Sequence, residues 1–183
     1  MIVKKRILIT NGSGGCGKDT MAEIMGKYVN VHKVSSIDII KKIVEPYTIE
    51  FTTLYGKQEQ YRRLLSDVKN AFIKFNDLPQ KTMEQEVLKF IEDENFHVLI
   101  VDIRDPEEIE KFKQIFPLGC VICKTILIIN NNVATIHSNA SDDNVANYAY
   151  DYILDNSQTL GVLEDSVITL LKDLGFEVEE DEQ

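Results

Sequence analysis

Residues 6–25 have the sequence RILITNGSGGCGKDTMAEIM, and this stretch decides the fold of the chain. A β-branched run leads into a glycine-rich segment, and the residues after it place apolar side chains at helical spacing. A strand, a glycine turn and a helix in this order direct successive backbone N–H groups, and the positive end of the helix dipole, toward one point. The segment 12–20 therefore predicts a loop that binds the phosphates of a nucleotide.

The spacing within this loop is specific. Gly12 is followed after four residues by Gly17 and Lys18, and Lys18 is expected to reach the β- and γ-phosphates of ATP as a point charge. A glycine-rich turn that binds nothing is the alternative, but it does not explain the lysine in register after a good strand. The predicted ATP phosphate-binding residues are Gly12, Ser13, Gly14, Gly15, Cys16, Gly17, Lys18, Asp19 and Thr20.

Asp19 stands where a Ser or Thr hydroxyl usually binds Mg²⁺. The helix dipole alone stabilises an acidic residue in the first turn, by about 0.3–1 kcal/mol. A second explanation is that the carboxylate contacts Mg²⁺, because a carboxylate beside phosphates is repelled unless a cation lies between them. The apolar run HVLIVD predicts a buried strand ending in Asp102, a second carboxylate at the ligand edge of the sheet. We expect Asp19 and Asp102 to be the metal-binding residues.

The rest of the chain alternates between strand and helix patterns. This alternation predicts a single α/β domain over 1–183, with three α/β/α layers around a mostly parallel sheet of about five strands. A helical insertion for the acceptor is expected at about 46–80, a lid-like region at about 130–148 and an acidic tail at 177–183. Pro46 is expected to stop the helix that begins with DIIKKIV.

Composition narrows the class of partner. A net charge of -10 over 183 residues argues against a nucleic-acid polymer, whose phosphates require basic surface. No apolar run is long enough to span a membrane or to act as a signal peptide, so we expect a cytoplasmic protein with no membrane partner. Cys120 and Cys123 are interpreted as thiols leading into a strand, rather than as a metal or redox pair, because no second pair exists.

Several segments resemble one family. GKDT at 17–20 with the following MAEIM, VLIVDIRDPEEIEKFK at 98–113 and DYILDNSQTLGVLEDSV at 151–167 are similar to the bacteriophage-type deoxynucleoside monophosphate kinases. The resemblance implies a P-loop kinase fold and Mg²⁺-ATP-dependent phosphoryl transfer to a deoxynucleotide. It also implies that Asp102 belongs to the metal site and that Arg104 binds the acceptor phosphate. Animal-type phosphomevalonate kinases are similar at the loop too, so Asp19 does not identify the acceptor.

The chain departs from the family pattern in two places. Asp105 replaces an aromatic residue after the Asp-x-Arg segment, and the segment 130–150 contains neither Arg nor Lys. Kinases of this class usually close a lid whose arginines contribute orders of magnitude to the rate. The absence leaves a place for a partner subunit, in a homodimer, to supply such a group.

The chain contains few arginines that could bind an acceptor phosphate. Arg62 and Arg63 lie in the predicted insertion, and adjacent residues of a helix face different directions, so one of the two is expected to point inward. Guanidinium groups bind phosphate in a bidentate, orienting way. The predicted acceptor-binding residues are Arg62, Arg63 and Arg104, and the predicted catalytic residues are Lys18, Arg104 and Asp102.

Three functions remain open at this point. The favoured one is Mg²⁺-ATP-dependent phosphoryl transfer to a (deoxy)nucleoside monophosphate, with ATP and a small phosphorylated acceptor as partners. A kinase of another phosphate- or hydroxyl-bearing metabolite is the second, with Asp38 or Asp105 as a base for a hydroxyl acceptor. A nucleotide-binding protein or weak ATPase without transferase activity is the third. The absence of Arg and Lys from the segment 130–150 favours this function.

Overall fold

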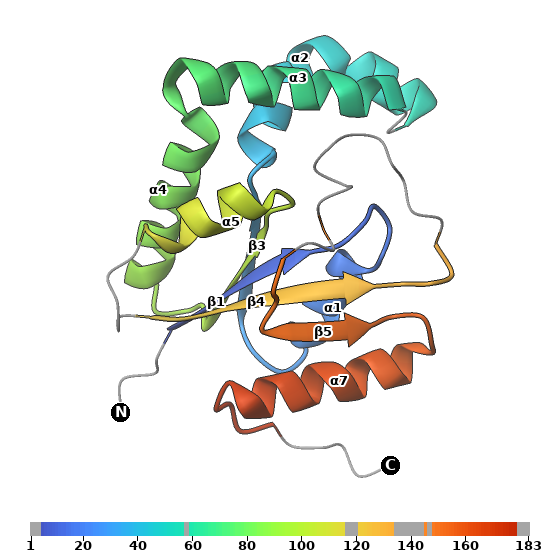
Figure 1. Cartoon of the computed structure of the whole chain (residues 1–183), viewed down its shortest axis with the longest axis vertical. Coiled ribbons are helices and arrows are strands. Elements are labelled where there is room, and N and C mark those ends of the chain that lie inside the picture. The colour runs from blue at the N-terminus through green and yellow to red at the C-terminus, as the bar shows by residue number, and fades with distance from the viewer. Residues whose placement is uncertain (1–4, 57–58, 116–120, 134–144, 146–147, 179–183) are drawn as a thin grey trace.

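A computed structural model describes residues 5–56, 59–115, 121–133, 145 and 148–178 (Figure 1). The helices and strands follow one another as β1 (Lys5–Asn11), α1 (Lys18–Met25), β2 (Val31–Ser35), α2 (Asp38–Tyr55), α3 (Glu59–Asn76), α4 (Leu78–Glu92), β3 (Val98–Asp102), α5 (Pro106–Lys113), β4 (Val121–Ile129), β5 (Tyr152–Asp155) and α7 (Leu160–Asp173). Cys120 and most of the predicted lid-like region and acidic tail lie outside the described residues.

The five strands form one sheet in the order β2-β3-β1-β4-β5, and every pairing is parallel. Helices α1 and α7 cover one face of the sheet, and α4 and α5 cover the other (Figure 1). The predicted three-layer α/β/α fold is therefore confirmed. In the register of the sheet, Thr10 and Ser35 both lie beside Asp102, so the carboxyl ends of β1, β2 and β3 meet at one edge.

The core follows from alternation along the buried strands. In β1, Ile7 and Ile9 pack toward α4 and α5, while Leu8 packs toward α1 and α7, and all three are fully buried. Burial of such a side chain contributes about 1.5–3 kcal/mol. A central strand with a helix layer on each face must therefore be apolar at successive positions, and this explains the continuous runs in β1 and β3.

Helices α2 and α3 lie beyond one edge of the sheet layers and share a small apolar cluster of Ile40, Val44 and Leu65 (Figure 1). The prediction that a helix ends near Pro46 is wrong, because α2 continues through Pro46 to Tyr55. Pro46 is on the exposed side of the helix. Water there can hydrate the carbonyl that the missing proline N–H leaves unpaired, so the break that proline usually causes does not occur.

None of the helices in the described part of the chain is both long and apolar enough to cross a membrane.

Candidate functional site

The glycine loop between β1 and α1 has a backbone that only glycine adopts without strain. Gly12, Gly15 and Gly17 have φ values of 144°, 82° and 106°. A Cβ on Gly12 would lie 2.4 Å from the carbonyl oxygen of Ile128, and a Cβ on Gly17 would lie 2.1 Å from Nδ2 of Asn156. The loop is thus packed closely against the ends of β4 and β5, which fixes its curvature.

Asn156, the residue after β5, holds the loop from one side. Its Nδ2 donates to the carbonyl of Cys16 at 2.9 Å, and its backbone N–H donates to the carbonyl of Ile129 at 2.8 Å. The loop is therefore anchored to the carboxyl ends of β4 and β5. No role was predicted for Asn156 from the sequence, although its position directly after a strand, at the edge where the strands end, is a signal for one.

Asn11, the last residue of β1, holds the loop from the other side. Its Oδ1 accepts from the N–H of Gly12 at 2.7 Å, and its Nδ2 donates to the carbonyl of Arg104 and to the hydroxyl of Tyr150, both at 2.8 Å. Burial raises the pKa of Tyr150 to about 12, so its hydroxyl keeps the proton that it donates to the carbonyl of Val145. Asn11, also missed by the sequence analysis, connects the loop to the segment after β3.

Lys18 begins α1, and its side chain reaches back across the loop. Its Nζ donates to the carbonyls of Gly12 at 2.8 Å and Ser13 at 3.1 Å. The ammonium therefore lies over the loop that the sequence predicts to bind phosphates. The side chain of Lys18 thus lies against the loop to which it belongs. The role of residues 12–20 in binding ATP stays a prediction.

The two predicted metal-binding carboxylates are joined by a lysine that the sequence analysis did not consider. Oδ2 of Asp102 lies 3.1 Å from Nζ of Lys33, and the same ammonium donates to Oδ1 of Asp19. The other oxygen of Asp102 accepts from the hydroxyl of Thr10. Burial of Lys33 alone would lower the pKa of its ammonium, but the contacts with Asp102 and Asp19 outweigh burial and raise that pKa.

The donor set at this point fits Mg²⁺ bound together with a nucleotide. Mg²⁺ prefers hard oxygen ligands and is usually held by one or two carboxylates plus substrate phosphates and water. Asp19 and Asp102 provide two such carboxylates on either side of one cation position. Among the described residues no group of three or more His, Cys, Asp or Glu side chains could hold a metal. The remaining ligands would therefore come from the nucleotide and from water.

A cavity of about 680 Å³ opens from the glycine loop along the ends of β2 and β3 to α2 and α3. Six basic and four acidic side chains line it, in a protein whose net charge is -10. This local excess of cations suits an anionic ligand. The charged residues that line the cavity are Lys18, Asp19, Lys33, Asp38, Lys41, Arg62, Lys69, Asp102, Arg104 and Asp105.

The cavity distinguishes between the two adjacent arginines of α3. Arg62 lines the cavity, whereas the side chain of Arg63 is 72% exposed and pairs with Glu59 at 3.2 Å. Arg104, on the loop between β3 and α5, lines the same cavity as Arg62. The structure thus brings Arg62 and Arg104 to one cavity with the glycine loop, and it leaves Arg63 on the outside of α3.

The two carboxylates considered as bases for a hydroxyl acceptor are already engaged. Asp38 accepts from the N–H of Ser35 at 2.8 Å and from Nζ of Lys41 at 2.7 Å. Asp105 caps the N-terminus of α5 by accepting from the N–H of Glu107 at 2.8 Å. Each carboxylate therefore has a structural partner, and the capping role also explains Asp105 at this position.

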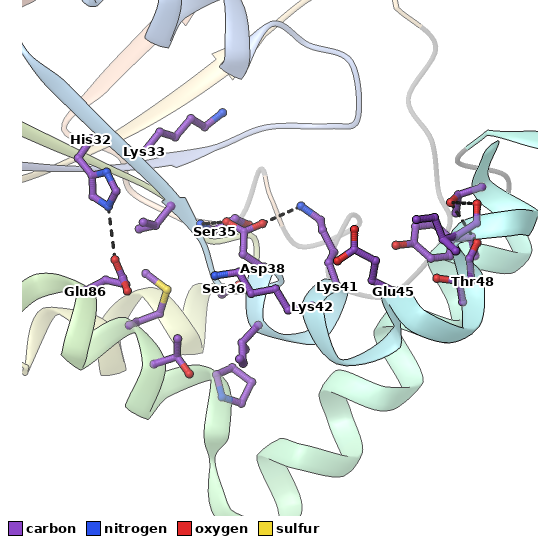
Figure 2. Close-up of a pocket in the computed structure, with 18 residues that line it drawn as sticks. His32, Lys33, Ser35, Ser36, Asp38, Lys41, Lys42, Glu45, Thr48 and Glu86 are labelled. Atoms are coloured by element: carbon purple, nitrogen blue, oxygen red, sulfur yellow. Dashed lines mark hydrogen bonds and ion pairs between the residues drawn. The ribbon is translucent and has the colours of Figure 1, made fainter.

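A second cavity of about 490 Å³ lies beside the first, between β2, α2 and α4 (Figure 2). His32 and Glu86, 3.4 Å apart, stand at one end of it, and Thr48 stands toward the other. Ser35, the last residue of β2, and Ser36, the residue after it, line both cavities. The two cavities therefore adjoin one another along the loop that connects the edge strand to α2.

No protein-family model matches the chain, and no curated protein matches it in sequence. Solved structures share its fold. A dephospho-CoA kinase from Campylobacter jejuni matches with a TM-score of 0.51 at 15% identity, covering 93% of this chain and 97% of that one. A sugar kinase from Janibacter sp. HTCC2649 matches with a TM-score of 0.51 at 12% identity, covering 92% and 95%. The chain therefore has the P-loop kinase fold, and its narrower resemblance to deoxynucleoside monophosphate kinases stays a prediction.

Proposed function

We propose that the protein transfers the γ-phosphoryl group of Mg²⁺-ATP to the phosphate of a (deoxy)nucleoside monophosphate. The observation that carries this proposal is the single cavity that runs from the glycine loop and Lys18 to Arg62 and Arg104. A donor phosphate site and a set of guanidinium groups in one cavity are what in-line transfer between two phosphates requires.

On the donor side, the loop amides and Lys18 would bind the phosphates of ATP, while Asp19 and Asp102 would hold Mg²⁺. Mg²⁺ would neutralise charge on the phosphates of the bound nucleotide. Asn11 and Asn156 hold the loop through the hydrogen bonds described above, so a bound nucleotide would meet a loop that is already ordered. Pre-organisation of this kind reduces the free energy that binding must spend on ordering the loop.

On the acceptor side, Arg62 and Arg104 would bind and orient the accepting phosphate. A phosphate monoester is largely ionised at neutral pH, with a second pKa of about 6, so its transfer needs no strong general base. In this proposal Asp38 and Asp105 keep the hydrogen bonds described above and need no role in proton transfer.

The nucleoside part of the acceptor is supported by two further observations. The second cavity adjoins the first and is lined by side chains of mixed polarity from α2, α3 and α4, among them Thr48, Tyr61 and Met83. Such a lining can contact a base and a sugar through both apolar surface and hydrogen bonds. Two of the three segments that resemble deoxynucleoside monophosphate kinases, the glycine loop and the β3–α5 segment, border the first cavity.

An ADP-release assay with Mg²⁺-ATP and a panel of ribo- and deoxynucleoside monophosphates tests this proposal. We expect turnover that depends on one acceptor and that Lys18→Ala abolishes without changing the melting temperature. Lys27→Ala is the matched control, because it removes the same charge from α1's C-terminal side, where Lys27 pairs with Glu164 at 2.7 Å. ADP release that needs no acceptor would instead indicate a weak ATPase, and an active Lys18→Ala variant would overturn the assignment of the loop.

A further inference from the structure

Lys33 places a positive charge where the site is expected to hold a metal ion. Its ammonium contacts Asp19 from α1 and Asp102 from β3, and Lys33 itself lies on the edge strand β2. Figure 2 shows the Lys33 side chain pointing to the opposite side of β2 from His32, which turns toward Glu86 on α4. This alternation directs Lys33 toward the helix layer that contains α1, and so toward Asp19.

The three side chains differ in their exposure. The Lys33 and Asp102 side chains are 24% and 16% exposed, whereas that of Asp19 is 89% exposed. The contact between Lys33 and Asp102 is thus shielded from water and is electrostatically stronger than a surface pair. Oδ1 of Asp102 accepts from Thr10, and the ammonium contacts Oδ2, so both oxygens of this carboxylate already have a partner.

An ammonium and a divalent cation cannot both contact these carboxylate oxygens at the same point. With Lys33 in place, a metal ion would meet a pair of carboxylates that the ammonium already partly neutralises, and the ammonium itself would repel the ion. A nucleotide changes this balance, because its phosphates supply further ligands to the metal and a new anionic partner for Lys33 in the same cavity.

We propose that Lys33 is the resident cation of the Asp19–Asp102 pair and restricts metal binding at this site to the metal–nucleotide complex. Lys33 is then a determinant of what the site binds: it opposes free divalent cations and gives way to a metal that arrives with phosphates. The inference rests on the metal site of the proposed function, but it does not require that phosphoryl transfer takes place.

Titration of the nucleotide-free, full-length protein with Mn²⁺, followed by electron paramagnetic resonance, tests the proposal. Mn²⁺ serves as the probe because it accepts the same oxygen ligands as Mg²⁺. We expect Lys33→Met to bind Mn²⁺ at least about tenfold more tightly than the wild type, a difference of about 1.4 kcal/mol. Adding Asp102→Asn to Lys33→Met should remove the gain, which would locate the ion at this carboxylate.

Lys41→Met is the matched control, because Lys41 lines the same cavity but pairs with Asp38 at 2.7 Å. Its Mn²⁺ affinity should equal that of the wild type. If Lys33→Met does not fold, Lys33→Gln removes the charge and keeps a hydrogen-bond donor to the carboxylates. Equal affinity of the wild type and the uncharged variant for Mn²⁺, including no measurable binding by either, would overturn the proposal.

The outcome is separable from that of the proposed function. Tighter Mn²⁺ binding by the variant in a protein that phosphorylates no acceptor would support the role of Lys33 and remove the transferase proposal. Acceptor phosphorylation together with unchanged Mn²⁺ affinity would do the reverse.

Discussion

Replacing Gly17 with alanine perturbs the phosphate loop at its tightest point. Gly17 has a φ of 106°, which an L-residue adopts only with strain of about 1–3 kcal/mol. The new Cβ would also lie 2.1 Å from Nδ2 of Asn156, so the amide must move away and lose its 2.9 Å hydrogen bond to the carbonyl of Cys16. Loss of a partner for a buried carbonyl costs about 1–3 kcal/mol.

Adding these two effects, we expect Gly17→Ala to lower the free energy of unfolding by about 2–6 kcal/mol. Asn156→Ala loses only the hydrogen bond, and the double variant loses that hydrogen bond once rather than twice. The effects of the two substitutions should therefore fall short of additivity by about 1 kcal/mol or more. ATP affinity should fall in both single variants, because the carbonyl that positions the loop is released in each.

Urea denaturation of the four proteins of this cycle measures the prediction. Gly161→Ala is the matched control, because Gly161 lies in α7, and its added Cβ would find its nearest neighbour 3.8 Å away. That substitution should be neutral or should stabilise by up to about 1 kcal/mol, since alanine is the better helix former. Additive effects at positions 17 and 156, or a Gly17→Ala variant as stable as the control, would show that the contact between Asn156 and the loop does not set the stability of the loop.

Three further predictions test the site and the fold. Arg62→Ala should lower kcat/KM for the acceptor by about tenfold or more, while Arg63→Ala, which removes the same charge from the outside of α3, should leave steady-state kinetics unchanged. Pro46→Ala should raise the free energy of unfolding, measured by urea denaturation, by about 1–3 kcal/mol, because α2 gains an N–H donor at an exposed position. A loss of stability in this variant would show that proline fits α2 without cost. Burial alone would raise the pKa of Asp151, but hydrogen bonds from Thr125 and Lys124 outweigh burial and lower that pKa. The wild type should therefore be more stable than Asp151→Asn at pH 7, and this difference should shrink as the pH falls below about 4 and the carboxylate is protonated. Denaturation curves that show the same difference at pH 7 and pH 3 would contradict this.

The sequence was most informative where local pattern and tertiary environment agree. The run before Gly12 is apolar at successive positions because β1 has helices on both faces, and the same holds for the strand ending in Asp102. The glycine spacing required a strand before the loop and a helix after it, and both are present. The three-layer fold follows from the repetition of such units along the chain.

The predictions failed or fell short where a residue's effect depends on partners far away in the sequence. The cost of Pro46 within a helix depends in part on whether the carbonyl that it leaves unpaired can reach water, and the sequence does not tell which side of α2 is exposed. Lys33 belongs to a strand pattern, and its contacts with Asp19 and Asp102 depend on the β2–β3 pairing and on the layer that holds α1. Alternation in β2 places Lys33 on one face, but only the assembled sheet brings it to the carboxylates.

Arg62 and Arg63 also show which part of the site follows from local sequence and which part depends on packing. Helical geometry predicts that Arg62 and Arg63 face different directions. Which of them lines the cavity depends on how α3 packs, and in α3 the apolar contact of Leu65 with Ile40 and Val44 fixes this rotation. Local pattern therefore limited the choice to one of two residues, and packing made the choice.

The proposed function requires that a phosphate-binding loop and an acceptor site act on one phosphoryl group. ³¹P NMR of Mg²⁺-ATP mixed with the protein and the nucleoside monophosphate that gives turnover in the panel follows that group directly. We expect resonances of a second nucleoside diphosphate to grow together with those of ADP, without inorganic phosphate, and none of them to grow with Lys18→Ala. Inorganic phosphate in place of the second diphosphate, or the same diphosphate made by the Lys18→Ala variant, would contradict the proposed function.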